Sequence, residues 1–263
     1  MSAAGTHAVR AVLVGAGGRM GRALVRAAPE FARLRITGAI AASGSPALGS
    51  DAGTLAGCAP LDVPVTADLA AALAHADVAI DFSRAEALPA TLAACRALGR
   101  ALLVGTTGWD AALEAALAAA ARDIPLLIAP NTSLAVAVLA ELTRRAAELL
   151  PQDFAISILE RHHAGKRDAP SGTARALAQA AAAGRAAATP PGQAIPIESQ
   201  RTGEVVGEHE VHFAGPGETL SLSHRARDRA LFARGALAAA LWLAPQPPGR
   251  YGMRDLLVGK TGT

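Results

Sequence analysis

The sequence predicts an α/β fold for the first half of the chain and an α+β fold for the second. In the first half, short apolar strands alternate with helical patterns, and a glycine-rich turn follows the first strand. Such alternation predicts βαβ units, in which a parallel sheet carries helices on both faces. After Asn131 the alternation stops, and successive strands with glycine-containing turns predict a mixed or antiparallel sheet. The 263 residues suffice for one large domain or two ordinary ones.

Apolar runs mark the strands of the first half, and helical patterns with a leucine face lie between them. Strands are expected at 11–16, 34–40, 77–83, 101–107 and 124–131. Helices are expected at 19–28, 67–76, 85–98 and 109–122, with a bend at Pro89 in the third.

The second half begins with a long helix, expected over 133–150 and ended by Pro151. A strand at 154–163, a helix at 173–184 and a loop at 188–193 follow. Three more strands are expected at 195–203, 207–215 and 218–226, then a closing helix at 230–243. The tail, 251–257, is expected to pack back on the first domain.

Composition excludes several classes of protein. No apolar run approaches the roughly 18 residues that span a membrane, and the N-terminal stretch lacks the apolar core of a signal peptide. The net charge is +3, but the arginines are scattered rather than clustered as a nucleic-acid footprint requires. The two cysteines, Cys58 and Cys95, form no metal-ligand spacing. We therefore expect a soluble, cytoplasmic protein that binds neither membranes nor nucleic acid.

The turn at 15–21, "GAGGRMG", follows a predicted strand and opens a predicted helix, which is the context of a dinucleotide-binding turn. Glycines let the backbone approach a pyrophosphate, and the helix N-terminus offers free amide groups to it. Gly15 and Gly17 fit the GxGxxG pattern, but the third glycine, Gly21, falls one place late, and Met20 occupies the expected position. An ordinary tight turn is the alternative interpretation.

The acidic residue that holds the ribose of NAD is expected roughly 20 positions after the turn. Ala41 and Ala42 stand there instead, and the next acid is Asp51. That loop also lacks an arginine for the 2′-phosphate of NADP, although Arg19 could reach it. The sequence therefore leaves the choice between NADH and NADPH open.

Three further segments lie where predicted parallel strands end: "DFSR" (81–84), "GTTG" (105–108) and "APNTS" (129–133). Ligands of open α/β sheets bind at this edge, and the hydroxyl and amide side chains suit a nicotinamide or a ribose. Each segment alone is more typical of a helix N-cap. Because several meet at one edge, together they favour a cofactor cleft.

Residues 162–174, "HHAGKRDAPSGTA", concentrate groups that carry chemistry. Histidine suits general acid–base catalysis. The neighbouring histidine and Arg167 are expected to disfavour the charged form of Lys166, which makes it a better proton donor. Ser171, Gly172 and Thr173 begin a predicted helix, whose free amide groups suit a carboxylate. A solvated loop with an ordinary N-cap is the alternative.

The scarcity of lysine supports a role for Lys166. Of the 25 lysines and arginines, only Lys166 and Lys260 are lysine. Lysine can lose a proton at an accessible pKa, whereas arginine effectively cannot. By contrast, the expected strand residues His209, His212 and His224 are interpreted as structural or peripheral, and no set of residues around position 162 has zinc-ligand spacing.

These motifs occur in the order "VGAGGRMGR", "DFS", "GTTGW", "APNTS", "ERHHAGKRDAPSGTA" and "RTGEVVGEHEVHFAGPGETLSLSHRARDR". In this, the sequence resembles the dihydrodipicolinate reductase (4-hydroxy-tetrahydrodipicolinate reductase) family of lysine and diaminopimelate synthesis. The resemblance covers nearly the whole chain. It implies a Rossmann-type parallel-sheet domain at 1–132, completed by 243–263, and an α+β domain with a mixed sheet at 133–242. By this resemblance, the second domain would bind the substrate and form a homotetramer.

The resemblance also implies roles for individual residues. His162 and Lys166 would be catalytic, and His163, Gly172 and Thr173 would bind a small dicarboxylate substrate. NADPH or NADH would be bound by Gly15, Ala16, Gly17, Gly18, Arg19, Met20, Gly105, Thr106, Thr107, Ala129, Pro130, Asn131 and Thr132. No metal is expected. The departure from the family lies at Ala41 and Ala42, where some members carry an acid and an arginine.

The implied reaction is the reduction of 4-hydroxy-tetrahydrodipicolinate, through dihydrodipicolinate, to tetrahydrodipicolinate. Two alternatives stay open on the sequence. One is a different dinucleotide-linked dehydrogenase of a small amino or keto acid. The other is a module that senses NAD(P) without turnover, against which the cluster of proton donors argues.

Overall fold

The computed structural model describes residues 7–185 and 194–259, so the loop expected at 188–193 lies outside the described residues. The chain divides into two compact units. The first comprises the described residues up to Thr132 together with those from Phe232 onward, and the second runs from Ser133 to Leu231. Residues 232–242 thus lie in the first compact unit, although the sequence placed them in the second domain. The domain division itself stays a prediction.

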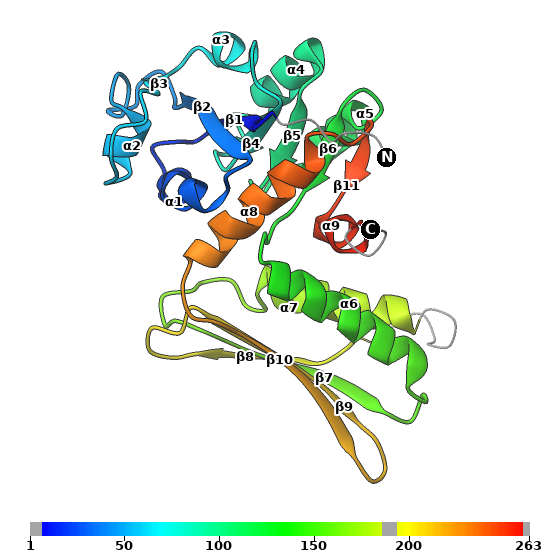
Figure 1. The fold of residues 1–263 in the computed structure, drawn as a ribbon. Coiled ribbons are helices and arrows are strands. Elements are labelled where there is room, and N and C mark those ends of the chain that lie inside the picture. Colours follow the sequence, from blue (N-terminus) through cyan, green and yellow to red (C-terminus); the bar gives the residue numbers. More distant parts are fainter. Residues whose placement is uncertain (1–6, 186–193, 260–263) are drawn as a thin grey trace. The chain divides into compact units, whose positions relative to one another are not determined.

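The first unit is built on a seven-stranded sheet in which every neighbouring pair is parallel (Figure 1). Its strands are β1 (Val9–Val14), β2 (Leu34–Ile40), β3 (Val65–Thr66), β4 (Val78–Asp81), β5 (Ala101–Val104), β6 (Pro125–Ile128) and β11 (Gly249–Tyr251). The order across the sheet is β11-β6-β5-β4-β1-β2-β3. The carboxyl ends of β1, β4, β5 and β6 therefore meet at one edge, as the Rossmann-type prediction requires.

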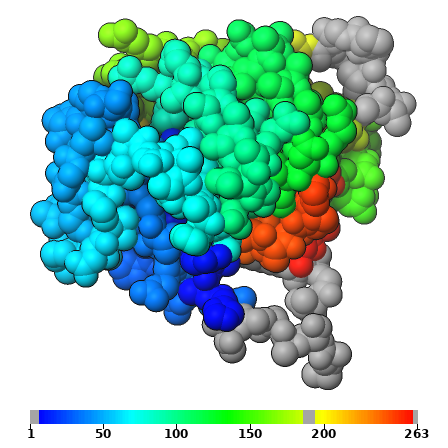
Figure 2. Space-filling model, turned by 90° about the horizontal axis from the view of Figure 1, so that it is seen from above, coloured from blue at the N-terminus to red at the C-terminus, as the bar shows by residue number. Residues whose placement is uncertain are grey.

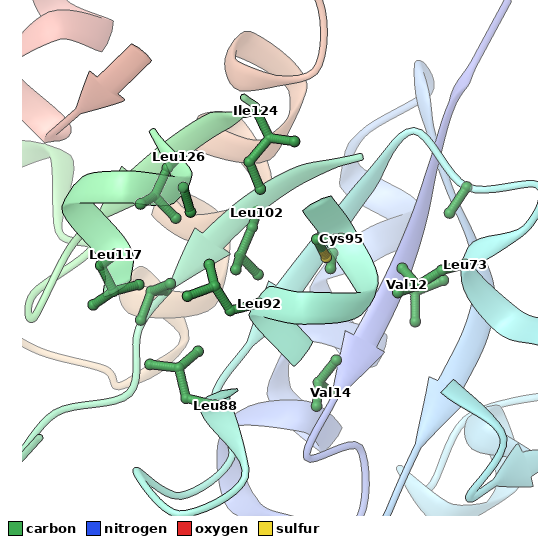
Figure 3. Packing of buried hydrophobic residues seen from close by; sticks show 14 of the residues in the cluster. Val12, Val14, Leu73, Leu88, Leu92, Cys95, Leu102, Leu117, Ile124 and Leu126 are labelled. Atoms are coloured by element: carbon green, nitrogen blue, oxygen red, sulfur yellow. The ribbon is translucent and has the colours of Figure 1, made fainter. Parts of the chain in front are cut away.

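Helices flank this sheet. They are α1 (Arg19–Ala27), the short 3₁₀ helix η1 (Ala28–Glu30), α2 (Ala52–Leu55), α3 (Leu69–Leu73), α4 (Leu88–Leu98), α5 (Ala111–Ala120), α8 (Ala230–Leu243) and α9 (Met253–Val258). Apolar side chains of α3, α4 and α5 pack against β1, β4, β5 and β6 in one core cluster (Figure 3). The same helices form the cyan-to-green surface that covers this core in Figure 2.

Two details of the first unit differ from the sequence-based expectation. The bend expected at Pro89 is wrong, because α4 begins at Leu88 and Pro89 lies in its first turn. A proline there removes an amide that has no partner within the helix anyway. The tail does return to this unit, but it does so partly as a strand: β11 pairs with β6 through Gly249–Pro125 and Tyr251–Leu127.

The second unit combines a mixed four-stranded sheet with two helices. The strands are β7 (Ala155–His162), β8 (Ile197–Arg201), β9 (Gly207–Ala214) and β10 (Thr219–Ala226), in the order β10-β9-β7-β8. β7 and β8 are parallel, and the other two pairs are antiparallel. Helices α6 (Leu134–Leu149) and α7 (Gly172–Gly184) pack on one face of this sheet (Figure 1).

The alternation of β7 explains which side chains enter the core of the second unit. Ile156, Ile158, Glu160 and His162 are buried, while the residues between them are more exposed. Successive side chains of a strand point to opposite faces, so these four share the face that carries α6 and α7. The apolar pair fills the core, and the two polar residues lie at the carboxyl end of the strand. None of the described helices is long and apolar enough to cross a membrane.

Candidate active site

The glycine turn joins β1 to α1 by a tight path that only small residues permit. Gly15 has a φ of +87°, and a Cβ on it would lie 2.9 Å from the carbonyl oxygen of Phe82. A Cβ on Gly21 would lie 2.5 Å from the carbonyl oxygens of both Gly15 and Ala16. Gly21 therefore provides the close helix–strand packing for which the third glycine of the fingerprint is needed, although it falls one place late in sequence.

The N-terminus of α1 is open to an anion. Its N-cap residue, Gly18, has no side chain to accept from the first-turn amides, and no acidic residue stands in that turn. Free amides and the positive end of the helix dipole together suit a pyrophosphate. The turn and the helix end thus fit the dinucleotide that the sequence implies.

A cavity of about 1080 Å³ opens in front of this turn. Gly15, Gly17 and Gly18 of the turn line it, together with the loop that follows β2 from Ala41 to Ala47. Among the residues that the structure describes, no aspartate or glutamate lines it, and the charged side chains of the lining are Arg22 and Arg84.

The other predicted cofactor residues lie outside this cavity lining. A Cβ on Gly105 would lie 2.1 Å from the ring of Phe82, so a side chain there would have to displace that ring. The hydroxyl of Thr106 donates to Asp81 Oδ1 over 2.9 Å, and the hydroxyl of Thr132 donates to the carbonyl of Phe232 over 2.7 Å. Gly105, Thr106 and Thr107 follow the end of β5, and Ala129, Pro130, Asn131 and Thr132 follow the end of β6 at the same edge of the sheet.

Asp81 organises this edge, a role that the sequence analysis did not assign to it. Its carboxylate is fully buried at the end of β4. Oδ1 accepts from the amide and the hydroxyl of Ser83, at 2.8 and 2.6 Å, as well as from Thr106. The carboxylate thus ties the loop after β4 to the loop after β5.

In the second unit, His162 is hydrogen-bonded through Nδ1 to the carboxylate of Glu160, two residues earlier on β7. His162 is 8% exposed and Glu160 is fully buried. Burial lowers the pKa of His162, and the carboxylate of Glu160 opposes that shift. Burial by itself would raise the pKa of Glu160, but the hydrogen bonds that it accepts from Arg201 and other neighbours outweigh burial and lower it.

Glu160 is also held from two other sides. Arg201 on β8 donates from Nη2 to Glu160 Oε1 over 2.8 Å, and the backbone amide of Ser171 donates to the same oxygen over 3.3 Å. Arg201 Nη2 also donates to the carbonyl of Asp168 over 2.6 Å. One buried carboxylate therefore joins β7, β8, the 162–171 loop and the start of α7.

His209 on β9 lies within this cluster, so it is not peripheral, whereas the other expectation for it, a structural role, stays a prediction. Its ring centroid is 5.1 Å from that of His162, and Nε2 is 3.4 Å from the hydroxyl of Ser171. Burial, followed by the charges of His162 and His224, lowers the pKa of His209 to about 4. His209 is therefore neutral at physiological pH.

Lys166 is bound to a carboxylate that the sequence analysis did not consider. Its Nζ donates to both oxygens of Asp168, over 2.7 and 2.8 Å. The charged group that contacts the Lys166 ammonium is thus the carboxylate of Asp168, whereas the sequence analysis considered only Arg167 and the neighbouring histidine. The side chain of Lys166 is 22% exposed, so it is partly accessible to a small molecule.

The start of α7 is where the sequence predicts an anion site, and that role stays a prediction. Ser171 caps the helix, and its Oγ accepts from the amide of Ala174 over 3.1 Å. Gly172 is exposed and Thr173 is half-buried, so the first turn faces outward. His163 is half-buried and is followed by a turn in which the Lys166 amide donates to its carbonyl over 3.0 Å.

Glu160, His162 and His209 each offer a metal-ligand atom, and these atoms lie within 4.8 Å of one another. The carboxylate, however, already binds the cationic Arg201, the Ser171 amide and His162. Because these three donors already occupy its oxygens, Glu160 is poorly suited to bind a metal ion as well. The expectation of no metal stays a prediction.

Two family sequence patterns match the chain. The pattern described as "Dihydrodipicolinate reductase, N-terminus" matches residues 9–132, and "Dihydrodipicolinate reductase, C-terminus" matches residues 135–257. The chain belongs to the dihydrodipicolinate reductase family. Family membership agrees with the resemblance inferred from the motifs and with the pairing of a parallel sheet and a mixed sheet.

Curated relatives of this reductase family are similar over almost their full length. The chain is 48% identical to the 4-hydroxy-tetrahydrodipicolinate reductase of Anaeromyxobacter dehalogenans strain 2CP-1 over 263 residues, covering 94% of this chain and 97% of that one. It is 46% identical to the protein of the same name from Alkalilimnicola ehrlichii, with coverages of 94% and 98%.

A solved structure shares the fold of this family member. It is the dipicolinate-bound dihydrodipicolinate reductase from Paenisporosarcina sp. TG-14, with a TM-score of 0.77, 22% identity and coverages of 94% and 99%. An amine dehydrogenase from Mycobacterium smegmatis is also similar in fold, with a TM-score of 0.62, 18% identity and coverages of 94% and 95%. The fold is therefore shared beyond the reductase family.

Proposed function

We propose that this chain reduces 4-hydroxy-tetrahydrodipicolinate, through dihydrodipicolinate, to tetrahydrodipicolinate with NADPH or NADH, in lysine and diaminopimelate synthesis. Family membership supports the reaction class. The observation that carries the proposal is local: a buried imidazole, His162, lies in the same hydrogen-bonded cluster as the capped start of α7. That cluster combines a proton-transfer group with amides for an anion.

The chemistry explains why these groups are needed. Loss of water from the hydroxylated ring leaves a conjugated imine, and addition of hydride at the far carbon pushes charge toward the ring nitrogen. The bound nicotinamide supplies that hydride. His162 and Lys166 hold and deliver the proton that completes the reduction, since both carry ionisable nitrogens that can donate.

Substrate orientation is assigned to the start of α7. The amides of Gly172 and Thr173 are proposed to bind one ring carboxylate, which the positive end of the helix dipole also favours. His163 is proposed to bind the same substrate. Holding the ring by its carboxylate fixes the reacting carbon and reduces the entropy cost of the hydride transfer.

Nucleotide binding is assigned to the first unit. The support is the glycine turn with its close contacts at Gly15 and Gly21, the uncapped start of α1 and the adjoining cavity. The predicted cofactor residues from Gly15 to Met20, Gly105 to Thr107 and Ala129 to Thr132 are proposed to bind the nucleotide, some of them from outside this cavity.

Assembly as a cytoplasmic homotetramer is a further part of the proposal. Within the second unit, α6 and α7 cover one face of the four-stranded sheet, and no helix of the described residues of this unit covers its other face (Figure 1). Light scattering on purified protein should return four times the 26.4 kDa chain mass, and cell fractionation tests the compartment.

The decisive experiment is a coupled assay. The substrate is generated from pyruvate and aspartate semialdehyde, and oxidation of NADPH or NADH is followed at the nicotinamide absorbance. Oxidation that requires the condensation product supports the proposal. Oxidation with other amino or keto acids would instead indicate a different dehydrogenase, and nucleotide binding without any turnover would indicate a sensing module.

A further inference from the structure

We infer that Glu160 is a positioning residue, which fixes the ring of His162 so that Nε2 is the nitrogen that exchanges a proton with the substrate. The inference rests on the proposed function, because it assumes that His162 transfers a proton. It adds a residue that stands at the start of one sequence motif but to which the sequence analysis assigned no role.

The geometry at Glu160 leaves its carboxylate little freedom. Its three donors are His162 Nδ1, Arg201 Nη2 and the backbone amide of Ser171. They approach from the same strand, from a neighbouring strand and from the start of α7. A fully buried carboxylate bound from three sides cannot rotate away, so it can determine the orientation of the imidazole.

The hydrogen bond also determines which nitrogen is available. A carboxylate only accepts, so the proton of that bond is on Nδ1 of His162. Nε2 then faces Gly207, where a Cβ would lie 3.1 Å away. Because residue 207 is a glycine, no side chain from this position fills the space in front of Nε2.

The surrounding charges make Glu160 the group that permits a protonated ring. Burial and the positive charges of Lys166 and Arg201 lower the pKa of His162, and Glu160 raises it. His209 faces the same ring, but it is neutral at physiological pH, with a pKa of about 4. Without the carboxylate, the imidazolium would be buried beside two cations.

The first measurement needs no variant at position 160. Long-range ¹H–¹⁵N NMR spectra of the whole protein report the tautomer of His162, whose signals are assigned by their loss in His162→Gln. The expected result is a proton on Nδ1 in the neutral ring. A proton on Nε2 would overturn the inference whether or not the protein proves to be this reductase.

The second measurement uses Glu160→Gln, which keeps an accepting oxygen but removes the charge. The pKa of His162 measured by NMR should fall by about one unit or more, as expected when an adjacent opposite charge is lost. Because the protonated ring is then lost at a lower pH, the decrease of kcat/KM on the alkaline side should also begin at lower pH. The value of kcat should drop at least tenfold, while nucleotide affinity should stay within twofold of the wild-type value.

The matched control is Glu198→Gln, the same change on β8, where the carboxylate accepts from the side chain of Gln200. It should leave the titration of His162 and the pH profile unchanged. Thermal unfolding shows whether Glu160→Gln is folded. If it is folded and its His162 keeps the wild-type pKa, Glu160 has a structural role only. If the wild-type protein itself showed no reductase activity, that result would reject the proposed function independently of the result at Glu160.

A second inference comes independently from the cavity of the first unit. We propose that Arg22 selects a nucleotide with a 2′-phosphate, so that NADPH is preferred over NADH. Arg22 donates from Nε to the carbonyl of Gly17 over 3.1 Å, which anchors its side chain beside the glycine turn. Among the described residues, neither Arg22 nor Arg84 forms an ion pair with a carboxylate.

The described lining of the same cavity has no carboxylate of the kind that selects NAD. A carboxylate after β2 would hold the ribose hydroxyls and repel a 2′-phosphate. In its place the lining offers Ala41, Ala42 and the hydroxyls of Ser43 and Ser45. A phosphate dianion would therefore meet an arginine and hydroxyls without an opposing negative charge.

Calorimetric titration of adenosine 2′,5′-bisphosphate and 5′-AMP tests this preference without any turnover. The bisphosphate should bind at least tenfold more tightly, and Arg22→Gln should remove that difference. Arg35→Gln, which removes an exposed arginine on β2, should preserve it and so control for net charge. Equal affinities in the wild type, or an unchanged difference in Arg22→Gln, would overturn the assignment. Failure to bind either nucleotide would count against the nucleotide site itself.

Discussion

The backbone amide of Ser171 donates to the carboxylate of Glu160 over 3.3 Å, so the residue that caps α7 is tied to the carboxylate that holds His162. The proposed anion site and the proposed proton donor thus share one buried group. A change at the cap should therefore affect both stability and substrate binding.

Replacing Ser171 with alanine removes the acceptor for the Ala174 amide. We expect the free energy of unfolding to fall by about 1 kcal/mol, as for other lost N-caps, and KM for the dicarboxylate to rise. Asp110→Ala removes the cap of α5, where Asp110 Oδ1 accepts from Leu113 over 2.9 Å. Urea titration should give a similar loss for both variants. If KM rose equally in Asp110→Ala, the rise in Ser171→Ala could not be assigned to the start of α7.

Lys166→Ala should lower kcat by about 100-fold or more, because it removes an ionisable nitrogen from the site. Lys166→Arg keeps the positive charge but cannot give up its proton, so it should remain impaired. Nucleotide affinity, measured by fluorescence titration, should stay at the wild-type value in both. Near-normal turnover in either variant would reject proton transfer by Lys166.

Acid should destabilise the fold through His209. Its pKa is about 4 in the folded protein against 6.5 for an ordinary histidine, so between these values the unfolded chain binds a proton that the folded chain does not. The free energy of unfolding therefore decreases as pH falls through this window, by roughly 3 kcal/mol at most from this residue.

Urea titrations of the whole protein at pH 7 and pH 5 measure this effect. The difference between the two pH values should be smaller in His209→Gln than in the wild type. His75→Gln, at an exposed position, should keep the wild-type difference. If the difference in His209→Gln were as large as in the wild type, groups other than His209 would cause the loss of stability in acid.

Gly21→Ala should destabilise the first unit and abolish nucleotide binding. Its Cβ would lie 2.5 Å from two carbonyl oxygens, and forcing the backbone apart costs roughly 1–3 kcal/mol. Gly217→Ala, where a Cβ has no neighbour within 4 Å, is the matched control. Thermal unfolding and calorimetric titration measure the two effects. Wild-type affinity in Gly21→Ala would show that the close approach is dispensable.

The sequence predicted the elements that have strong local signals. β2 and α8 have the predicted bounds, 34–40 and 230–243. β11 was missed because a three-residue strand has almost no pattern of its own and forms only where the edge of β6 offers hydrogen-bond partners. The bend predicted at Pro89 failed because a proline's effect depends on its place in the helix, which only the true start of α4 reveals.

The same distinction applies to the candidate site. The sequence by itself determined what is contiguous: His162, Lys166 and the helix start at Ser171, together with the glycine turn before α1. Only the tertiary structure decided what surrounds them. Strand register places His209 opposite Glu160 and Arg201 opposite His162. A register between distant strands is set by packing of the whole sheet, so no local pattern could show that one buried carboxylate joins these groups.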